Sequence, residues 1–172
     1  MDDVDRKILA ELQADGRLTL TELADRVRLS VSPCHRRLRT LERSGAIAGY
    51  HAQLDASVLG LTFEALVFVT MRYADRQTVA AFEEHVADIP NVLQAQRLFG
   101  DPDYLLRVVA RDLPAYRELY DERLATLPGV LRVSSTLVMK SVVDTRPLPL
   151  LTPRLSRPRP GSRRGTSRTG RG

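Results

Sequence analysis

The order of hydrophobic patterns between residues 62 and 143 constrains the fold more than any other feature of this chain. Strand-like alternation and helical periodicity succeed one another as β-α-β-β-α-β, over residues 62–73, 76–90, 91–100, 103–111, 113–129 and 130–143. This order predicts a ferredoxin-like α+β domain, in which four antiparallel strands carry both helices on one face. The opposite face then needs cover, and a partner subunit is the simplest cover. We therefore expect a homodimer whose buried sheet face is apolar through Val67, Val69, Val108, Val133 and Val138.

The first 54 residues show a helical pattern in three parts. Thr19 and Glu22 have the spacing of a capping box, which predicts a short helix over residues 20–27. One helix precedes it, and a brief break leads into a third helix that Gly45 ends. Two helices joined by a tight turn predict a helix-turn-helix, and the alternation after Gly45 predicts a wing strand over residues 46–54.

The third helix separates apolar from basic side chains. Ser32 offers an N-cap oxygen and Pro33 fits the first helical position. At about 100° per residue, the apolar residues form one buried stripe, made of Cys34, Leu38 and Leu41. The polar and basic side chains outside it are the expected DNA contacts: Ser30, Ser32, His35, Arg36, Arg39 and Arg43. Arg37 lies nearer the apolar stripe and is expected either to pair locally or to contact a phosphate.

Two other interpretations of this helix were weighed. A solvated charged face is the common fate of a charge run, but here four arginines accompany one acid, Glu42, directly after a helix-turn-helix break. Arginine forks grip phosphates or read guanine edges, so DNA recognition is favoured. Cys34 and His35 do not form a nucleophilic or metal pair, because adjacent helical side chains point in different directions. We expect Cys34 to lie in the core.

The stretch LFGDPDYLL, residues 98–106, is the second candidate site. Gly100 lets the backbone turn sharply, and the residues after it have turn chemistry. One interpretation is a plain hairpin. The other is a polar loop that holds a small zwitterion, with backbone N–H groups facing a carboxylate and an acid facing an ammonium. Ser134 and Thr136 share one side of the last strand and line either a pocket or a solvated sheet edge.

Charge and composition limit the remaining classes. The net charge of +5 comes from the last 27 residues, which hold eight arginines and no acid. Residues 151–172 are rich in Pro, Gly, Ser and Arg, so we expect a disordered tail that either holds nucleic-acid phosphates or is an incidental extension. No transmembrane run, catalytic cluster or metal spacing occurs, and one cysteine suits a reducing compartment. We therefore expect a cytoplasmic protein that is not an enzyme and has no cofactor.

The chain resembles the Lrp/AsnC family of transcriptional regulators over about residues 2–150. The resemblance is carried by DDVDRKILAELQADGRLTLTELADRVRLS, RRLRTLERSGAIAGYHAQLD, GDPDYLLRV, LPGV at 127–130 and LPL at 148–150. It implies a winged helix-turn-helix, a ligand-sensing domain, dimers that often assemble into octamers, and an amino acid bound between subunits. Carried onto this sequence, the effector site is Leu98, Gly100, Asp101, Asp103 and Tyr104, with Ser134 and Thr136 contributing less. His35 departs from an aromatic residue expected in many relatives, and the Arg-rich tail is no part of the family pattern.

These observations give one domain plan and two functional hypotheses. We expect a DNA-binding domain over residues 1–54, a linker over 55–62, an effector-binding and oligomerisation domain over 63–150, and the tail over 151–172. The favoured function is sequence-specific transcriptional regulation of double-stranded DNA, modulated by an amino acid. The alternative is an architectural DNA-binding protein without an effector, which the basic tail suggests.

Overall fold

The computed structural model describes residues 1–144 and 146–150, which divide into two compact units. One comprises residues 1–51 together with the described residues 146–150, and the other comprises residues 52–144. The predicted tail over residues 151–172 lies outside the described residues. The sequence-based plan had placed residues 146–150 in the effector-binding domain, whereas the structure groups them with the N-terminal unit.

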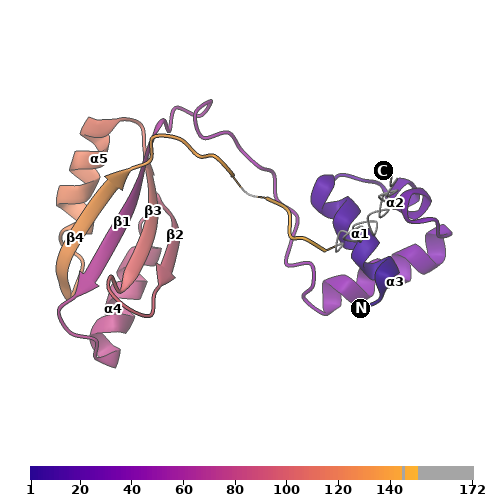
Figure 1. The fold of residues 1–172 in the computed structure, drawn as a ribbon, viewed down its shortest axis with the longest axis horizontal. Helices are drawn as coiled ribbons and strands as arrows, with labels where there is room; N and C mark the ends of the chain where they lie inside the picture. Colours follow the sequence, from indigo (N-terminus) through magenta and orange to yellow (C-terminus); the bar gives the residue numbers. More distant parts are fainter. Residues whose placement is uncertain (145, 151–172) are drawn as a thin grey trace, which may run out of the picture. The chain divides into compact units, whose positions relative to one another are not determined.

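The N-terminal unit contains three helices, α1 (Asp3–Ala14), α2 (Leu20–Val27) and α3 (Val31–Arg43) (Figure 1). The predicted capping box of α2 is present: the Glu22 amide donates to Thr19 Oγ1 at 3.2 Å, and the Thr19 amide donates to the Glu22 carboxylate at 2.8 Å. The three helices enclose one apolar core, whose buried members are Ile8, Leu9, Leu23, Ala24, Val27, Cys34 and Leu41. Cys34 therefore lies in the core, as predicted.

Two details of this unit differ from the sequence-based prediction. The N-cap of α3 is Ser30 rather than Ser32, so Pro33 occupies the third helical position. A proline costs little there, because the first four amides of a helix have no intrahelical acceptor. Residues 46–54 form no strand, so the predicted wing strand is wrong. Alternation alone does not make a strand where no described partner strand pairs with it.

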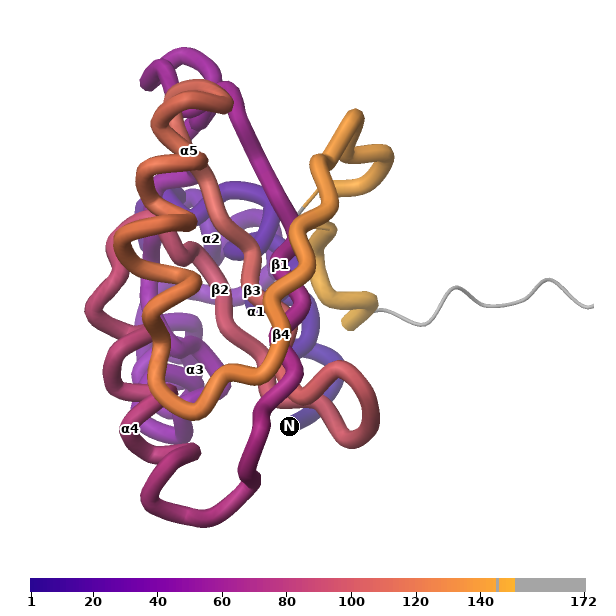
Figure 2. Tube along the Cα trace, turned by 90° about the vertical axis from the view of Figure 1, so that its left-hand side faces the viewer, coloured from indigo at the N-terminus to yellow at the C-terminus, as the bar shows by residue number. Residues whose placement is uncertain are grey.

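The second unit has the predicted β-α-β-β-α-β order. It consists of β1 (Phe63–Met71), α4 (Arg76–Ala87), β2 (Val92–Arg97), β3 (Tyr104–Ala110), α5 (Leu113–Leu119), a π-helical turn η1 (Tyr120–Leu124) and β4 (Val130–Leu137). The strands form one antiparallel sheet in the order β2-β3-β1-β4. Figure 2 shows α4 and α5 on the same side of this sheet. The ferredoxin-like prediction is confirmed.

The sequence-based prediction named the wrong residues for the uncovered face of the sheet. Val67, Val69 and Val108 are fully buried between the sheet and the helices, and Val133 packs against the same core. Val138 follows the end of β4. The uncovered face instead carries the alternate positions of β1 and β3. Its half-buried apolar side chains are Leu66, Phe68 and Leu105.

A bidentate ion pair crosses the uncovered face between the two central strands. Arg107 donates from Nε and Nη2 to the two carboxylate oxygens of Glu64, at 2.8 and 3.0 Å. This hydrogen bonding, followed by the attraction of the Glu64 charge, raises the pKa of Arg107 above its ordinary value. The face is therefore less apolar than the sequence suggested, and it has a fixed polar centre.

Candidate functional site

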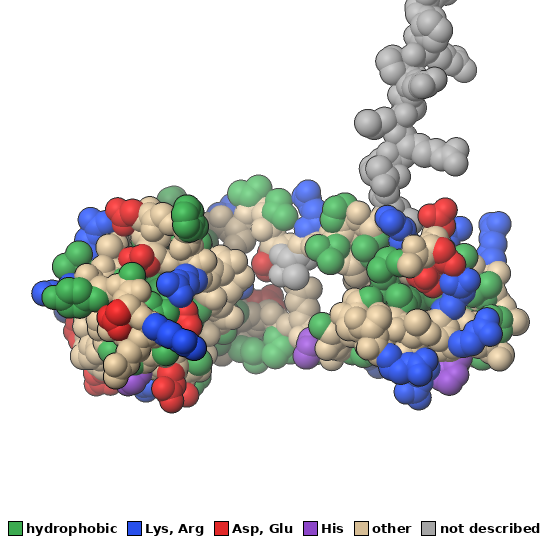
Figure 3. All heavy atoms as spheres, turned by 90° about the horizontal axis from the view of Figure 1, so that it is seen from below, with side chains coloured by type: hydrophobic (Ala, Val, Ile, Leu, Met, Phe, Trp, Pro, Cys, Tyr) green, Lys and Arg blue, Asp and Glu red, His purple; other side chains and the backbone are tan. Residues whose placement is uncertain are grey.

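The outer side of α3 gathers the basic residues that the sequence singled out. Ser30, Ser32, His35, Arg36, Arg39 and Arg43 are all exposed, and we call this set the reading face. His35, the three arginines and Glu42 line an open groove of about 680 Å³. Figure 3 shows Lys and Arg side chains projecting from the helical unit, with a histidine beside them. The amphipathic prediction for α3 is confirmed by its buried stripe.

Contacts within the helix hold part of the reading face in place. Arg39 Nε donates to His35 Nε2 at 3.3 Å, and Arg43 Nε donates to the Arg39 carbonyl at 3.2 Å. The acid in the groove, Glu42, accepts a hydrogen bond from the Tyr50 hydroxyl at 3.2 Å. The remaining guanidinium nitrogens of these arginines are exposed donors suited to phosphate oxygens or guanine edges.

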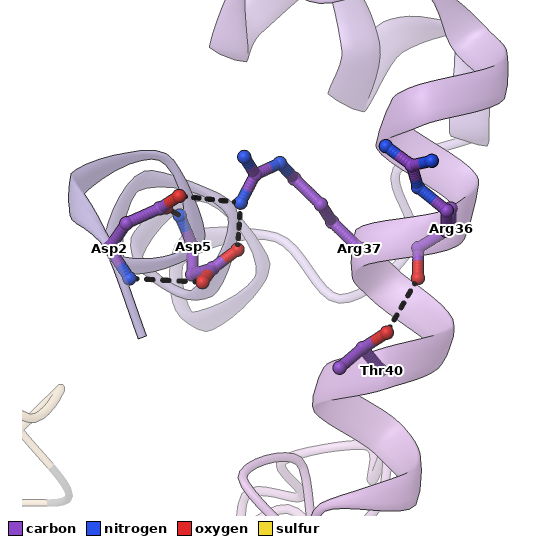
Figure 4. A network of polar contacts seen from close by, with 5 residues as sticks. All are labelled: Asp2, Asp5, Arg36, Arg37 and Thr40. Atoms are coloured by element: carbon purple, nitrogen blue, oxygen red, sulfur yellow. Dashed lines mark hydrogen bonds and ion pairs between the residues drawn. The ribbon is translucent and has the colours of Figure 1, made fainter.

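Arg37 belongs to a different network from Arg36, although the two are neighbours in sequence. Arg37 Nη1 lies 2.8 Å from carboxylate oxygens of both Asp2 and Asp5, at the start of α1 (Figure 4). Asp2 and Asp5 also form the capping box of α1. Of the two alternatives for Arg37, local pairing is the one that the structure contains, so Arg37, which the sequence also made a candidate for a DNA phosphate, is not counted in the reading face.

We call Arg37 with Asp2 and Asp5 the clamp, and the pKa shifts within it follow from its hydrogen bonds. The Asp5 amide, and then the Arg37 guanidinium, hold the pKa of the Asp2 carboxyl below its ordinary value. The carboxylates of Asp5 and Asp2 in turn raise the pKa of Arg37. Figure 4 also shows the Arg36 guanidinium apart from this cluster, with no contact drawn to Asp2 or Asp5. The clamp therefore ties α3 to α1 and leaves Arg36 unengaged by it.

The loop over residues 98–104 is fastened to β1 by Asp103. The Asp103 carboxylate accepts a hydrogen bond from the Met71 amide at 2.7 Å, and the Asp103 amide donates to the Val69 carbonyl at 2.9 Å. The Leu98 amide closes the loop by donating to the Asp103 carbonyl at 2.7 Å. Gly100 has φ of +139°, a conformation that favours glycine. Asp103 thus has a structural role in holding the loop against β1.

A cleft of about 270 Å³ opens beside this loop on the uncovered sheet face. We call it the loop cleft, and its lining residues are Phe68, Thr70, Pro102, Arg132 and Ser134. The register places Thr70 opposite Arg132 and Phe68 opposite Ser134. Asp101 stands at its rim, where it accepts from Thr70 Oγ1 at 3.2 Å and lies 3.8 Å from Arg132 Nη2. A cation and two hydroxyls therefore line a small space with one aromatic wall, and an anion lies at its rim.

The structure brings together only part of the predicted effector set. Asp101 and Ser134 meet at the loop cleft, and Thr136 is exposed on the same face but does not line it. Tyr104 lies on the opposite face, 3% exposed, where its hydroxyl donates to Glu83 at 2.7 Å. Burial, reinforced by Glu83, raises the pKa of Tyr104 to about 12. Leu98 is partly exposed in the loop, outside the cleft lining.

Sequence reasoning missed Phe68, Thr70 and Arg132, whereas Pro102 lies within the predicted loop. The strand alternation that placed Ser134 and Thr136 on one side also places Arg132 there, so Arg132 had a usable signal. Phe68 and Thr70 required the pairing of β1 with β4, which no local pattern gives. Within the described ranges, no group of histidine, cysteine or acidic residues suits a metal ion. No helix in residues 1–144 or 146–150 is long and apolar enough to cross a bilayer.

Two family models match this chain. Residues 1–48 match a winged helix-turn-helix DNA-binding model, and residues 64–148 match the Lrp/AsnC ligand binding domain. The first match covers α1 to α3, and the second covers the sheet with its loop cleft. The matched segments therefore contain both candidate sites.

Characterised relatives and solved structures agree with these models. The chain is 40% identical over 143 residues to the Bkd operon transcriptional regulator of Pseudomonas aeruginosa, covering 83% of this chain and 94% of that protein. It is also 40% identical over 144 residues to a leucine-responsive regulatory protein of Rhizobium meliloti, covering 84% and 92%. A transcriptional regulator from Neisseria meningitidis, solved as a complex with L-Met, superposes with a TM-score of 0.83 at 38% identity, covering 87% and 97% of the two chains.

Proposed function

The chain belongs to the Lrp/AsnC family of DNA-binding transcriptional regulators, and we propose that α3 reads its operator while an amino acid in the loop cleft controls the outcome. The family is one of transcriptional regulators and not of enzymes. The proposal assigns the family's two activities to particular residues of this chain. A cytoplasmic location follows from it, because the operator lies there.

The separation of Arg36 from Arg37 carries the DNA part of the proposal. Arg37 is neutralised by two carboxylates, whereas Arg36, Arg39 and Arg43 present exposed guanidinium groups along one side of a helix. Ser30 and Ser32 stand at the amino end of that helix, where hydroxyls and free N–H groups suit phosphate oxygens. In a helix-turn-helix, the second helix of the motif enters the major groove and its amino-terminal residues contact base edges. The reading face has this composition and position.

A homodimer supplies the symmetry that such a reading face needs. The uncovered sheet face carries Leu66, Phe68 and Leu105 around the Glu64–Arg107 pair, and a second copy related by a two-fold axis would cover it. Two copies of α3 would then read half-sites about one helical turn apart. We propose a homodimer, and octamers built from it, as the regulatory assembly.

The loop cleft suits a free amino acid by its charges. Arg132 faces the space as a carboxylate ligand, and Asp101 at the rim as an ammonium ligand. Thr70 and Ser134 add hydroxyls, and Phe68 offers an apolar wall to the side chain. The cleft opens on the face that we assign to the subunit interface, so a ligand there would bias assembly. The Neisseria meningitidis structure, with its L-Met, supports an amino acid as the ligand class.

A thermal-shift screen of the full chain against the twenty amino acids tests the effector. A ligand that binds only the folded state raises the melting temperature by mass action, so the true effector stands out at millimolar concentration. L-Met is the first probe. Arg132→Gln is expected to abolish the shift, and Arg117→Gln, an exposed arginine on α5, is the matched control. A screen in which no amino acid acts, or a shift that Arg132→Gln preserves, removes the effector assignment and leaves the DNA assignment standing.

A further inference from the structure

One hydrogen bond of the reading face depends on the protonation state of a histidine. Arg39 Nε donates to His35 Nε2 at 3.3 Å, one helical turn along α3. A ring nitrogen accepts a hydrogen bond only when it carries no proton, so this contact requires a neutral imidazole with its proton on Nδ1. When His35 is protonated, both of its ring nitrogens are donors. Protonation of His35 therefore breaks its contact with Arg39.

This contact holds the Arg39 guanidinium in one direction. An arginine side chain samples many rotamers in water, and fixing it beforehand reduces the entropy that is lost when it forms two parallel hydrogen bonds to a guanine edge. The Arg39 carbonyl separately accepts from Arg43 Nε at 3.2 Å, and that bond does not involve the imidazole. Protonation of His35 therefore releases Arg39 and leaves Arg43 in place.

The charges around His35 are mostly positive. The other residues that line its groove all belong to α3, and they are Arg36, Arg39, Glu42 and Arg43. The one acid, Glu42, accepts from the hydroxyl of Tyr50, which lies in the segment after α3. Three guanidinium groups disfavour a further cation beside them, whereas the phosphates of a bound duplex favour it. Binding to a phosphate backbone therefore promotes the uptake of a proton by His35.

We infer that neutral His35 positions Arg39 to read a base, and that protonation of His35 turns the reading face toward sequence-independent binding of phosphates. The inference rests on the proposed reading face of α3 and adds a form of regulation to it. Histidine is the side chain whose charge ordinarily changes between about pH 5 and pH 8. At the upper end of that range, Arg39 is fixed for reading. At the lower end, Arg39 is mobile and the imidazolium adds a cation to the groove.

The two protonation states differ in two measurable quantities. An imidazolium that contacts a phosphate adds about 0.9 to the slope of log K against log salt concentration for each subunit. Uptake of one proton on binding raises the affinity by up to about tenfold for each unit by which the pH falls. Loss of a base contact by arginine lowers the affinity for the preferred sequence, relative to a mixed sequence, by about 5-fold or more. Acid therefore strengthens non-specific binding and weakens discrimination.

The experiment measures DNA binding by the full-length protein at about pH 5.5 and about pH 8, by fluorescence anisotropy over a range of salt concentrations. The probes are a mixed-sequence duplex and a duplex that the protein selects from a random library at the higher pH. We call the affinity for the selected duplex, divided by that for the mixed-sequence duplex, the affinity ratio. Melting temperatures at both pH values show that every form is folded.

Three variants are compared with the natural chain. His35→Gln keeps an acceptor oxygen that does not titrate, and His35→Leu has neither an acceptor nor a charge. His85→Gln removes an exposed histidine of α4 and is the matched control.

The natural chain and His85→Gln are expected to lose about 5-fold or more of the affinity ratio at the lower pH, while they bind the mixed-sequence duplex more tightly and with a steeper salt slope. His35→Gln is expected to keep the high ratio at both pH values, because its oxygen still accepts from Arg39. His35→Leu is expected to have the low ratio at both, because nothing holds Arg39.

Three outcomes overturn the inference. They are an affinity ratio of the natural chain that does not change with pH, a change that persists in His35→Gln, and a natural ratio in His35→Leu at the higher pH. Failure of the proposed reading face gives a different result, because Arg36→Ala then binds both duplexes like the natural chain.

Discussion

Arg36 and Arg37 adjoin in sequence and should respond oppositely to the same substitution. Arg36→Ala removes a guanidinium that forms no ion pair with an acid among the described residues, whereas Arg37→Ala removes the partner of two carboxylates 2.8 Å away. We expect Arg36→Ala to weaken operator binding without lowering the melting temperature. We expect Arg37→Ala to lower the melting temperature of the helical unit and to leave base discrimination unchanged. Each variant is thus the matched control for the other.

The size of the Arg36 effect follows from its position in the reading face. A base contact is worth about 1–3 kcal/mol, so Arg36→Ala would lower affinity for the selected duplex by about 5- to 150-fold at each half-site. The affinity for a mixed-sequence duplex would change far less. If Arg36 contacts only a phosphate, both affinities fall together and the salt slope drops by about 0.9 for each subunit. Anisotropy titrations with the two duplexes separate these cases.

The Arg37 effect has a pH dependence of known sign. The pKa of Asp2 lies below its ordinary value of 3.8 in the folded chain, because the Asp5 amide and Arg37 stabilise its charged form. Its stabilising contribution is therefore present above pH 3.8 and is lost as the pH falls toward the lowered folded pKa. The melting temperatures of the natural chain and of Arg37→Ala should converge in acid. A loss of base discrimination in Arg37→Ala, with none in Arg36→Ala, would refute the assignment of the two residues.

Three further substitutions or reactions test the fold. Gly129→Ala should destabilise more than Gly45→Ala in chemical denaturation. Both glycines have φ near +72°, which costs a residue with a Cβ about 1–2 kcal/mol, but a Cβ at Gly129 would also clash with the Thr78 methyl carbon, whereas a Cβ at Gly45 meets open space. Tyr104 has a pKa of about 12, so the folded state should lose stability as the pH rises above 10. Tyr104→Phe should lower the free energy of unfolding by about 0.5–1.5 kcal/mol near neutral pH, and should remove the tyrosinate absorbance step that occurs at the highest pH. Cys34 is buried, and burial raises the pKa of its thiol, so a thiol reagent should label the native chain only as fast as the helical unit unfolds locally. Fast labelling of the folded protein would contradict the placement of Cys34 in the core.

Local patterns in the sequence determined which elements form. Each of these patterns depends on residues within one or two helical turns or within one strand. They are the capping box of Thr19 and Glu22, the apolar stripe of Cys34, Leu38 and Leu41, and the periodicity of the strand and helix segments of the second unit. Their preferences act over short distances along the chain, and the structure reproduces them. The polar composition of the reading face was readable for the same reason.

Tertiary structure decided what depended on distant residues or on a choice between equivalent faces. Strand alternation separates Val67 from Phe68 but does not say which of the two meets the helices, so the predicted interface residues fell on the wrong side. Arg37 finds acids more than 30 residues away, and Arg132 joins Thr70 only through the pairing of two strands. Leu148 binds Gln13 across 135 residues of chain. These contacts exist because packing brings remote segments together, and no short stretch of sequence carries that information.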